Sequence, residues 1–383
     1  MSQPEHPRIL ILYTETGGTH ANAASAIIEA IEHQTQENCQ VDLVDVWAYA
    51  KFPLKYLPRM IFWFRERQPI SRWHSRNSHS KIRLERFNFL AHSYLQKVLP
   101  AILKDHPSDL IISVHPITSA PVIEVISADV DIPFWVVVTD IATRNAFWFD
   151  HRATLTIVPT AKVMNYAAQI GLPLEKFHVM GVPVLKSYKV DPLVKEEVCR
   201  ELNMDPDKPV VMVAGGKSGV GPVDAVAQRI DEHFDSVNLL VLSGRNESLK
   251  KRLSEYNWNN LTHVFGYVND LWRLMWAADV MVTKAGTGML AEALSVELPM
   301  ILFHRVPYLE DSNVSFLVEN GAALWAPTPK MVVNALSRWL ENPKAFESAQ
   351  KACRNLAKPE AALELGKLIT KQAEQHLMQT HRN

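Results

Sequence analysis

Residues 279–294 have the sequence DVMVTKAGTGMLAEAL, and this stretch decides the fold. It opens with a short apolar run of the kind found in strands that are buried on both faces of a sheet. Gly286 and Gly288 follow at once, and the small and apolar residues after them suit a helix. The stretch therefore predicts a strand, a glycine-bearing turn and a helix, which together form part of a βαβ unit.

The same alternation recurs along the whole chain. In the N-terminal half we expect strands at residues 8–14, 41–47, 109–115, 133–140, 154–159 and 177–183. In the C-terminal half we expect them at residues 209–216, 238–244, 262–268, 279–286, 299–304 and 321–326. Helical patterns separate most of these runs, which favours parallel, doubly wound sheets. We therefore predict an α/β protein with two Rossmann-like domains that face a cleft.

The pattern also predicts where the domains begin and end. We place the first domain at residues 1–190, the second at 205–350, and a helical tail at 351–383. In open α/β sheets, ligands bind outside the carboxyl ends of the strands. Two glycine-bearing turns, at Gly17 and Gly215, follow predicted strands and should lie at such ends.

Composition excludes several classes of protein. The chain has 383 residues, with 40 Lys and Arg against 41 Asp and Glu, so its formal net charge is −1. A generic nucleic-acid binder carries a large basic excess, so we expect no nucleic-acid partner. The three cysteines are far apart and have no His cluster beside them, which argues against a structural zinc site or a disulfide framework. No apolar run reaches the roughly 18 residues of a membrane span, so we expect a cytoplasmic protein that meets a membrane only from its surface.

The turn at Gly286 has the features of an anion site. Backbone N–H groups at the start of a helix, together with the Thr287 hydroxyl, can receive a diphosphate. Glu292 lies on the first turns of the same helix, where it could reach a sugar or ribose hydroxyl. The alternative is that the glycines only make a tight turn and that Glu292 only suits the helix dipole.

A second glycine-rich stretch, AGGKSGVGP at residues 214–222, also follows a predicted strand directly. Its glycines would let a phosphate or nucleotide approach the backbone, and they are Gly215, Gly216, Gly219 and Gly221. The spacing matches neither a P-loop nor GxGxxG. A flexible connecting loop is the other interpretation.

His20 follows the first predicted strand, after Gly17, Gly18 and Thr19. It should begin a helix, where the pKa of an imidazole tends to be lowered. A neutral histidine at such a place can act as the general base for an alcohol, although a lone histidine is more often structural. Asp140 ends the strand at 133–140, where it could orient a substrate or a base, or cap a turn.

Residues 51–86 form a basic and aromatic segment, with ten basic residues against two acidic ones, or +8. Basic residues mixed with large aromatics suit an interfacial segment on anionic lipid. The same mixture could bind a nucleic-acid strand, or it could be a solvated basic face with its aromatics in the core.

The order of these motifs resembles the monogalactosyldiacylglycerol synthase family, with the related bacterial diacylglycerol glucosyltransferases and, more distantly, the MurG-type enzymes. These are GT-B glycosyltransferases of the family 28 type that use UDP-sugars. The resemblance runs from about residue 9 to 326. The fragments that carry it are TETGGTHANAASAI (14–27), SVHP (113–116), VVTDIATRNAFWF (137–149), GVPV (181–184), AGGKSGVGPV (214–223), LSGRN (242–246), TKAGTGMLAEAL (283–294) and VPYLEDSN (306–313).

The resemblance implies roles for the matching residues. His20 would deprotonate the lipid hydroxyl, with Asp140 as the second catalytic residue. The donor site would comprise Gly215, Gly216, Gly219, Gly221, Thr283, Gly286, Thr287, Gly288, Glu292, Glu310 and Asn313. Which of Glu292 and Glu310 contacts the ribose stays open. The acceptor and membrane side would comprise Gly17, Gly18, Arg59, Phe62, Trp63, Phe64, Arg65 and Trp73.

The implied reaction is an inverting transfer of galactose or glucose from a UDP-sugar to diacylglycerol, on the inner face of an anionic membrane. No metal or cofactor is expected, because helix dipoles and backbone amides stabilise the leaving diphosphate. The chain departs from the family at Thr19, at Lys217 and Ser218, and at Leu309, which replaces a glutamine expected to contact the hexose. A UDP-sugar epimerase or hydrolase, and a nucleotide-sugar- or lipid-binding protein with a decayed site, are the alternatives.

Overall fold

The computed structural model describes residues 6–14, 18–35, 38–49, 92, 94–129, 132–189, 193–307 and 309–380. The chain forms two compact units. The first unit is Met1–Lys186 with Pro359–Asn383, and the second is Ser187–Lys358. The expected tail at 351–383 is therefore divided, because its start belongs to the second unit and its last helix to the first.

The first unit holds a six-stranded sheet in the order β2-β1-β3-β4-β5-β6, and all of its strand pairs are parallel. Its strands are β1 (Arg8–Tyr13), β2 (Gln40–Asp45), β3 (Leu110–Ser113), β4 (Phe134–Val137), β5 (Leu155–Val158) and β6 (Phe177–Val179). Its helices include α1 (Thr19–Thr35), α5 (Pro116–Asp129), α6 (Ala161–Gln169) and α15 (Ala361–Thr380).

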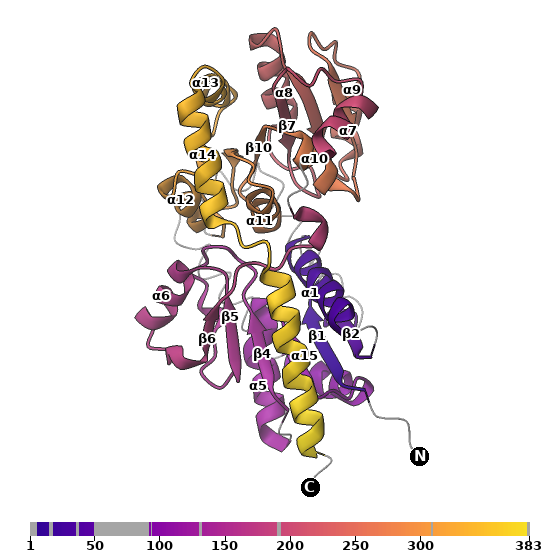
Figure 1. Ribbon diagram of the computed structural model, residues 1–383. Coiled ribbons are helices and arrows are strands. Elements are labelled where there is room, and N and C mark those ends of the chain that lie inside the picture. The colour runs from indigo at the N-terminus through magenta and orange to yellow at the C-terminus, as the bar shows by residue number, and fades with distance from the viewer. Residues whose placement is uncertain are drawn as a thin grey trace. The chain divides into compact units, whose positions relative to one another are not determined.

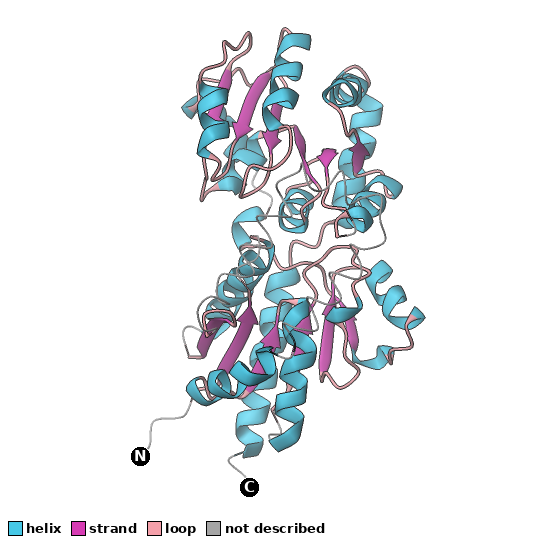
Figure 2. Cartoon of the chain, turned by 180° about the vertical axis from the view of Figure 1, so that it is seen from behind, coloured by secondary structure: helices cyan, strands magenta, loops and turns pink. Residues whose placement is uncertain are grey.

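Strand β1 shows why its sequence is apolar throughout. Leu10 and Leu12 belong to one buried cluster, whereas Ile9 and Ile11 belong to another. Successive side chains of a strand point to opposite faces, so a strand that is covered on both faces needs apolar residues at every position. The strands of both units accordingly lie between helices (Figure 2).

The second unit holds another six-stranded parallel sheet, in the order β12-β11-β10-β7-β8-β9. Its strands are β7 (Val210–Ala214), β8 (Asn238–Leu242), β9 (Thr262–Phe265), β10 (Val280–Lys284), β11 (Met300–His304) and β12 (Ala323–Trp325). Its helices are α7 (Leu193–Glu201), α8 (Val223–His233), α9 (Glu247–Ser254), α10 (Leu271–Ala277), α11 (Thr287–Ser295), α12 (Asp311–Glu319), α13 (Pro329–Leu340) and α14 (Pro343–Leu356). The two parallel sheets confirm the predicted α/β fold.

The last helix, α15, packs against the first, α1 (Figure 1). Leu365, Ile369 and Ala373 of α15 are buried in the same cluster as the isoleucines of β1 and α1. The helices approach closely at Gly366, where an added Cβ would come within 2.9 Å of the Ala30 Cβ. The C-terminal helix thus completes the apolar cover of the N-terminal sheet.

The strand orders bring specific turns together. In the first sheet β1, β3 and β4 are neighbours, and in the second β11, β10 and β7 are neighbours. Because all of these strands are parallel, the turns that follow them lie at one edge of each sheet. Among the described residues, no helix has the length and apolar character needed to cross a membrane.

Candidate functional site

The first cluster lies at the carboxyl edge of the first sheet. His20 is the second residue of α1, which follows β1. His115 lies between β3 and α5, and Asp140 lies three residues beyond the end of β4. Trp148 ends a short 3-10 helix, η2 (Ala146–Trp148), in the segment after Asp140. Three neighbouring strands thus supply one polar side chain each to the same place.

The ring of His20 is held on several sides. Its Nδ1 lies 2.8 Å from the hydroxyl of Thr139, a residue that is fully buried. The ring of His115 packs edge-on against it, with 4.4 Å between the ring centroids and 72° between the planes. The buried indole of Trp148 lies on another side, at a centroid distance of 5.9 Å. His20 as a whole residue is partly exposed.

Burial lowers the pKa of His20 below its ordinary value, whereas the charge of Asp140 and a hydrogen bond to the backbone of Val114 act in the opposite direction. Desolvation rather than the helix end is therefore the cause, which differs from the cause expected from the sequence. Asp140 Oδ2 accepts a hydrogen bond of 2.9 Å from the Trp148 indole N–H. Asp140 is thus oriented by Trp148 and acts on His20 through its charge.

His115 is a residue for which the sequence predicted no role. Burial, and then the neighbouring His20, hold the pKa of His115 well below its ordinary value. The signal was present in the SVHP fragment, because His115 follows a strand in the same way as His20 and Asp140 do. Only the order of strands in the sheet shows that β1, β3 and β4 are neighbours, and therefore that the residues after them lie close together.

The second cluster lies at the carboxyl edge of the second sheet and begins with the glycine loop after β7. This loop is folded tightly on itself, with hydrogen bonds from Gly219 N–H to the Gly216 carbonyl (3.0 Å) and from Val220 N–H to the Gly215 carbonyl (2.9 Å). Gly219 has a φ of +60°, and a Cβ there would collide with the Ser243 carbonyl oxygen. The loop is therefore a closely packed element with its own hydrogen bonds, which favours the phosphate-site interpretation over a flexible connection.

An ion pair stands between the glycine turns of this unit. Lys284 Nζ lies 3.2 Å from Glu310 Oε1, and each side chain is only 13% exposed. The other oxygen, Oε2, accepts a hydrogen bond of 2.7 Å from the Val306 N–H. A Cβ at Gly216 would lie 3.1 Å from Lys284 Cε, and one at Gly286 would lie 3.3 Å from it. Lys284 is thus a cation between the two predicted diphosphate turns, and the sequence had assigned it no role.

Two of the predicted donor residues shape the turn before α11. Thr283 is fully buried, and its hydroxyl donates to the Ala214 carbonyl at 3.0 Å. The Asn313 amide donates to the Ala285 carbonyl (3.1 Å) and to the Thr287 hydroxyl oxygen (2.9 Å). The hydroxyl of Thr283 and the amide of Asn313 therefore bond other groups of the protein and hold the turn in its conformation.

The two candidate ribose residues have different surroundings. Glu292 is buried, and it accepts a hydrogen bond from Tyr188, whose pKa is raised by burial and then by the charge of Glu292. Glu310 is bound by Lys284 and Val306 and precedes α12 as its N-cap residue. Glu310 lies beside Gly286, where an added Cβ would be 3.7 Å from its Oε1. Gly221 and Gly288 remain partly exposed in their turns.

The sequence of the whole chain matches known families in both units. Residues 20–184 match the monogalactosyldiacylglycerol (MGDG) synthase family, and residues 210–365 match the glycosyltransferase family 28 C-terminal domain. The chain is 32% identical to the probable chloroplastic monogalactosyldiacylglycerol synthase of Glycine max, over 94% of this chain and 70% of that protein. The chain belongs to the monogalactosyldiacylglycerol synthase family. It is a glycosyltransferase, and its family moves a sugar to a lipid.

Solved structures agree with this family on the fold. The MurG structure from Acinetobacter baumannii has a TM-score of 0.59 at 16% identity, over 95% of this chain and 99% of that chain. A UDP-GlcNAc 2-epimerase from Neisseria meningitidis, bound to UDP-GlcNAc, has a TM-score of 0.60 at 13% identity, over 95% and 98%. Transferases and epimerases share this architecture, so the likeness establishes the GT-B fold alone.

Several predicted residues of this family member lie outside the described residues. They are Gly17, Arg59, Phe62, Trp63, Phe64, Arg65 and Trp73, together with the whole basic segment at 51–86. Gly18 is described, and its carbonyl accepts the first helical hydrogen bond of α1, from Asn22 N–H at 2.9 Å. Within the described part of the chain, no group of three or more His, Cys, Asp or Glu side chains has an arrangement that could hold a metal ion.

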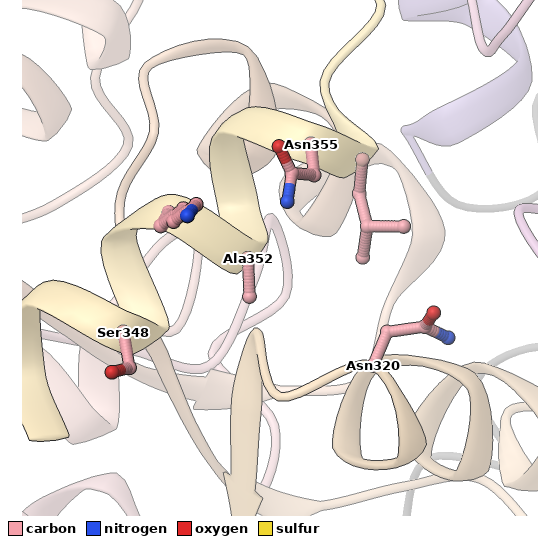
Figure 3. Close-up of a pocket in the computed structure, with 6 residues that line it drawn as sticks. Asn320, Ser348, Ala352 and Asn355 are labelled. Carbon is pink, nitrogen blue, oxygen red and sulfur yellow. The ribbon is translucent and has the colours of Figure 1, made fainter.

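A separate cavity of about 230 Å³ lies beside α14 (Figure 3). Its lining comes from the end of α12 and from one side of α14, and consists of Asn320, Ser348, Lys351, Ala352, Asn355 and Leu356. No predicted donor or acceptor residue lines it, so the candidate sites are the two strand-end clusters, one in each unit.

Proposed function

We propose that the protein transfers a hexose from a UDP-sugar to a diacylglycerol-type lipid, with inversion at the anomeric carbon. The observation that carries the proposal is the family match, which runs through both units and includes His20 in its first unit. The two strand-end clusters supply what the reaction needs. One holds a base for the lipid hydroxyl, and the other holds groups for a diphosphate.

On the donor side, the diphosphate of the UDP-sugar binds at the turns after β7 and β10. Helix α11 begins at Thr287, directly after Gly286, and the positive end of its dipole favours a negatively charged group such as the diphosphate. Lys284 adds a positive charge where charge develops as UDP leaves. The protein thereby stabilises the leaving group with its own cation and helix end, and we propose that no metal or cofactor takes part.

On the acceptor side, His20 takes the proton of the lipid hydroxyl while the hydroxyl oxygen attacks the anomeric carbon. The bond between that carbon and the diphosphate breaks, and its electron pair leaves with UDP. Because burial keeps His20 neutral, it can accept a proton at neutral pH. The negative charge of Asp140 stabilises the imidazolium that forms.

We further propose that the lipid reaches the protein at a membrane surface. The +8 segment at residues 51–86, with its tryptophans and phenylalanines, has the composition of an interfacial segment on anionic lipid. Each basic residue near such a surface contributes about 1 kcal/mol of attraction. The protein would then be peripheral, on the inner face of the membrane.

The family also favours transfer over the alternatives. A UDP-GlcNAc 2-epimerase has a similar fold, but the relatives that support the assignment are named monogalactosyldiacylglycerol synthases. We do not favour a decayed binding protein, because the chain retains His20, Asp140 and the glycine turns that the family resemblance singles out.

The test is incubation with radiolabelled UDP-galactose and UDP-glucose in turn, with diacylglycerol in vesicles that contain or lack anionic lipid. We expect labelled glycolipid with at least one donor, and more of it on anionic vesicles. Chromatography of the lipid extract measures the product. Sugar nucleotide consumed equally without lipid would favour the epimerase or hydrolase, and UDP binding without any product would favour the binding protein.

A further inference from the structure

We propose that His115 is a positioning residue for the transfer reaction, which packs edge-on against His20 and keeps that imidazole shielded from water in its proton-accepting form. The inference rests on the proposed function of His20 as the base. It assigns a role to a side chain that does no chemistry itself.

His115 is held in place through its backbone. Its carbonyl oxygen accepts hydrogen bonds from the hydroxyls of Ser113 (3.0 Å) and Thr118 (2.8 Å). These two hydroxyls are fully buried and lie 2.6 Å from each other. Pro116 begins α5 directly after His115, which fixes the direction in which the chain leaves the turn. The position of the His115 ring is therefore set by its own turn.

The same turn fixes the protonation of His115. The backbone N–H of Ile117 donates to His115 Nδ1 at 3.2 Å, so this nitrogen must present a lone pair. A second proton on the ring would be carried by Nδ1, where its N–H would point at the Ile117 N–H. A charge on His115 would also repel a charge on His20, which lies in ring contact. His115 thus stays neutral, and the proton taken from the substrate remains on His20 beside Asp140.

The contact with His115 explains the environment of His20. The rings of His115 and Trp148 cover two sides of the His20 imidazole, and each ring that covers it removes water that would stabilise the charged form. Among the described residues, the ionisable groups that face His20 are Asp140 from the segment after β4 and His115 from the turn after β3. The charge of Asp140 favours the charged form of His20, whereas the shielding by His115 favours the neutral form.

Two variants separate shielding from other roles. His115→Ala opens one side of His20 to water, so the pKa of His20 should rise toward its ordinary value. The acid limb of the pH–rate profile for transfer should move to higher pH with it, and the loss at pH 6 should be at most about fourfold if the pKa returns to its ordinary value of about 6.5. His115→Phe keeps a ring against His20, so the limb should stay within a few tenths of a pH unit of the wild-type position.

The decisive measurement is the titration of the His20 imidazole by NMR on protein labelled at its histidines, because it needs no substrate. His115→Asn, which can still accept from the Ile117 N–H, serves as a second small variant, and melting temperature and UDP binding report that each variant is folded. An unchanged His20 titration in the Ala and Asn variants would overturn the inference, as would an equal shift in the Phe variant. Near-normal transfer by His20→Ala would show that His20 is not the base, and absence of glycolipid product from the wild-type protein would overturn the proposed function, whatever the titration shows.

Discussion

The two units have the same architecture and different chemistry at the same place. Each is a six-stranded parallel sheet, and in each the candidate residues follow three neighbouring strands. In the first unit these turns carry histidines, an aspartate and a buried indole. In the second they carry glycines and an ion pair between Lys284 and Glu310. The sheet supplies the position, and the few residues that follow the strands decide the function.

The difference has a physical reason. The proposed base must be neutral to accept a proton, and the first cluster surrounds His20 with rings and buried groups that disfavour charge. A diphosphate must be bound as an anion, so the second cluster offers helix N–H groups and a cation, and its glycines let the backbone come close. Variants in each unit should therefore fail in different ways, which gives four tests.

The largest effect is expected for His20→Ala. Loss of the base should lower the transfer rate about a thousandfold, because the lipid hydroxyl then loses its proton only to water. UDP binding by the second unit should be unchanged. Transfer is followed with labelled donor, and UDP binding by calorimetry. His33→Ala, an exposed change on the same helix, is the control. Near-normal turnover of the His20 variant would show that this residue is not the base.

The next effect is expected for Lys284→Met. Removal of the cation should lower kcat/KM about a hundredfold, because the charge that develops on UDP is no longer compensated. The acid limb of the pH–rate profile, which the proposed base His20 sets, should stay at the same pH. A change in rate without a change in this limb distinguishes the second cluster from the first. Steady-state kinetics over a range of pH measure both quantities.

Lys195→Met is the matched control for this variant. Lys195 forms an ion pair with Asp279, which lies before β10 at the opposite end of the strand from Lys284. This variant should retain transfer. Equal losses in the two lysine variants would mean that charge removal, rather than the position of Lys284, caused the effect.

Gly219→Ala should destabilise the second unit by about 2 kcal/mol, because the residue has a φ of +60° and its Cβ would meet the Ser243 carbonyl. Gly321→Ala is the control, since Gly321 has a φ of +77° but its nearest neighbour is the Ala352 Cβ at 3.7 Å. That control should cost only the backbone strain, about 1 kcal/mol. Urea unfolding compares the two. Equal stability losses would contradict the tight packing of the loop.

The smallest effect is expected for Asp140→Asn. The negative charge of Asp140 raises the pKa of His20 against the effect of burial, so its removal should lower that pKa further. Because the proposed mechanism uses the neutral form of His20, the acid limb of the pH–rate profile should move to lower pH. The Trp148 indole can still donate to the Asn oxygen. A limb that moves to higher pH would show that Asp140 does more than provide charge.

Much of the fold was predictable. All twelve expected strands are present, because strands that are covered on both faces leave a continuous apolar run in the sequence. The division of the C-terminal segment was not predicted. Helix α15 is part of the first unit because Gly366 and its apolar neighbours fit against α1, a long-range contact that no local pattern reports.

The candidate site was predictable in part. His20, Asp140 and the glycine turns follow strands, and their residue types carry a recognisable chemistry. The surroundings of three other predicted residues could not be read from the sequence. Thr283 bonds Ala214, Glu292 bonds Tyr188, and Asn313 bonds the turn at the start of α11. Such partners are far apart in the sequence, and they decide whether a polar group faces a ligand or the protein.

The sequence by itself therefore determined the family, the alternation of strands and helices, and the residue types at the strand ends. Each of these depends on local order, which the chain carries directly. Only the tertiary structure brought His115 against His20 and placed Lys284 between the glycine turns. The order of strands in a sheet and the burial of each side chain depend on contacts between distant residues. In this protein those contacts set the different surroundings of His20 and His115, on which the proposed role of His20 as the base depends.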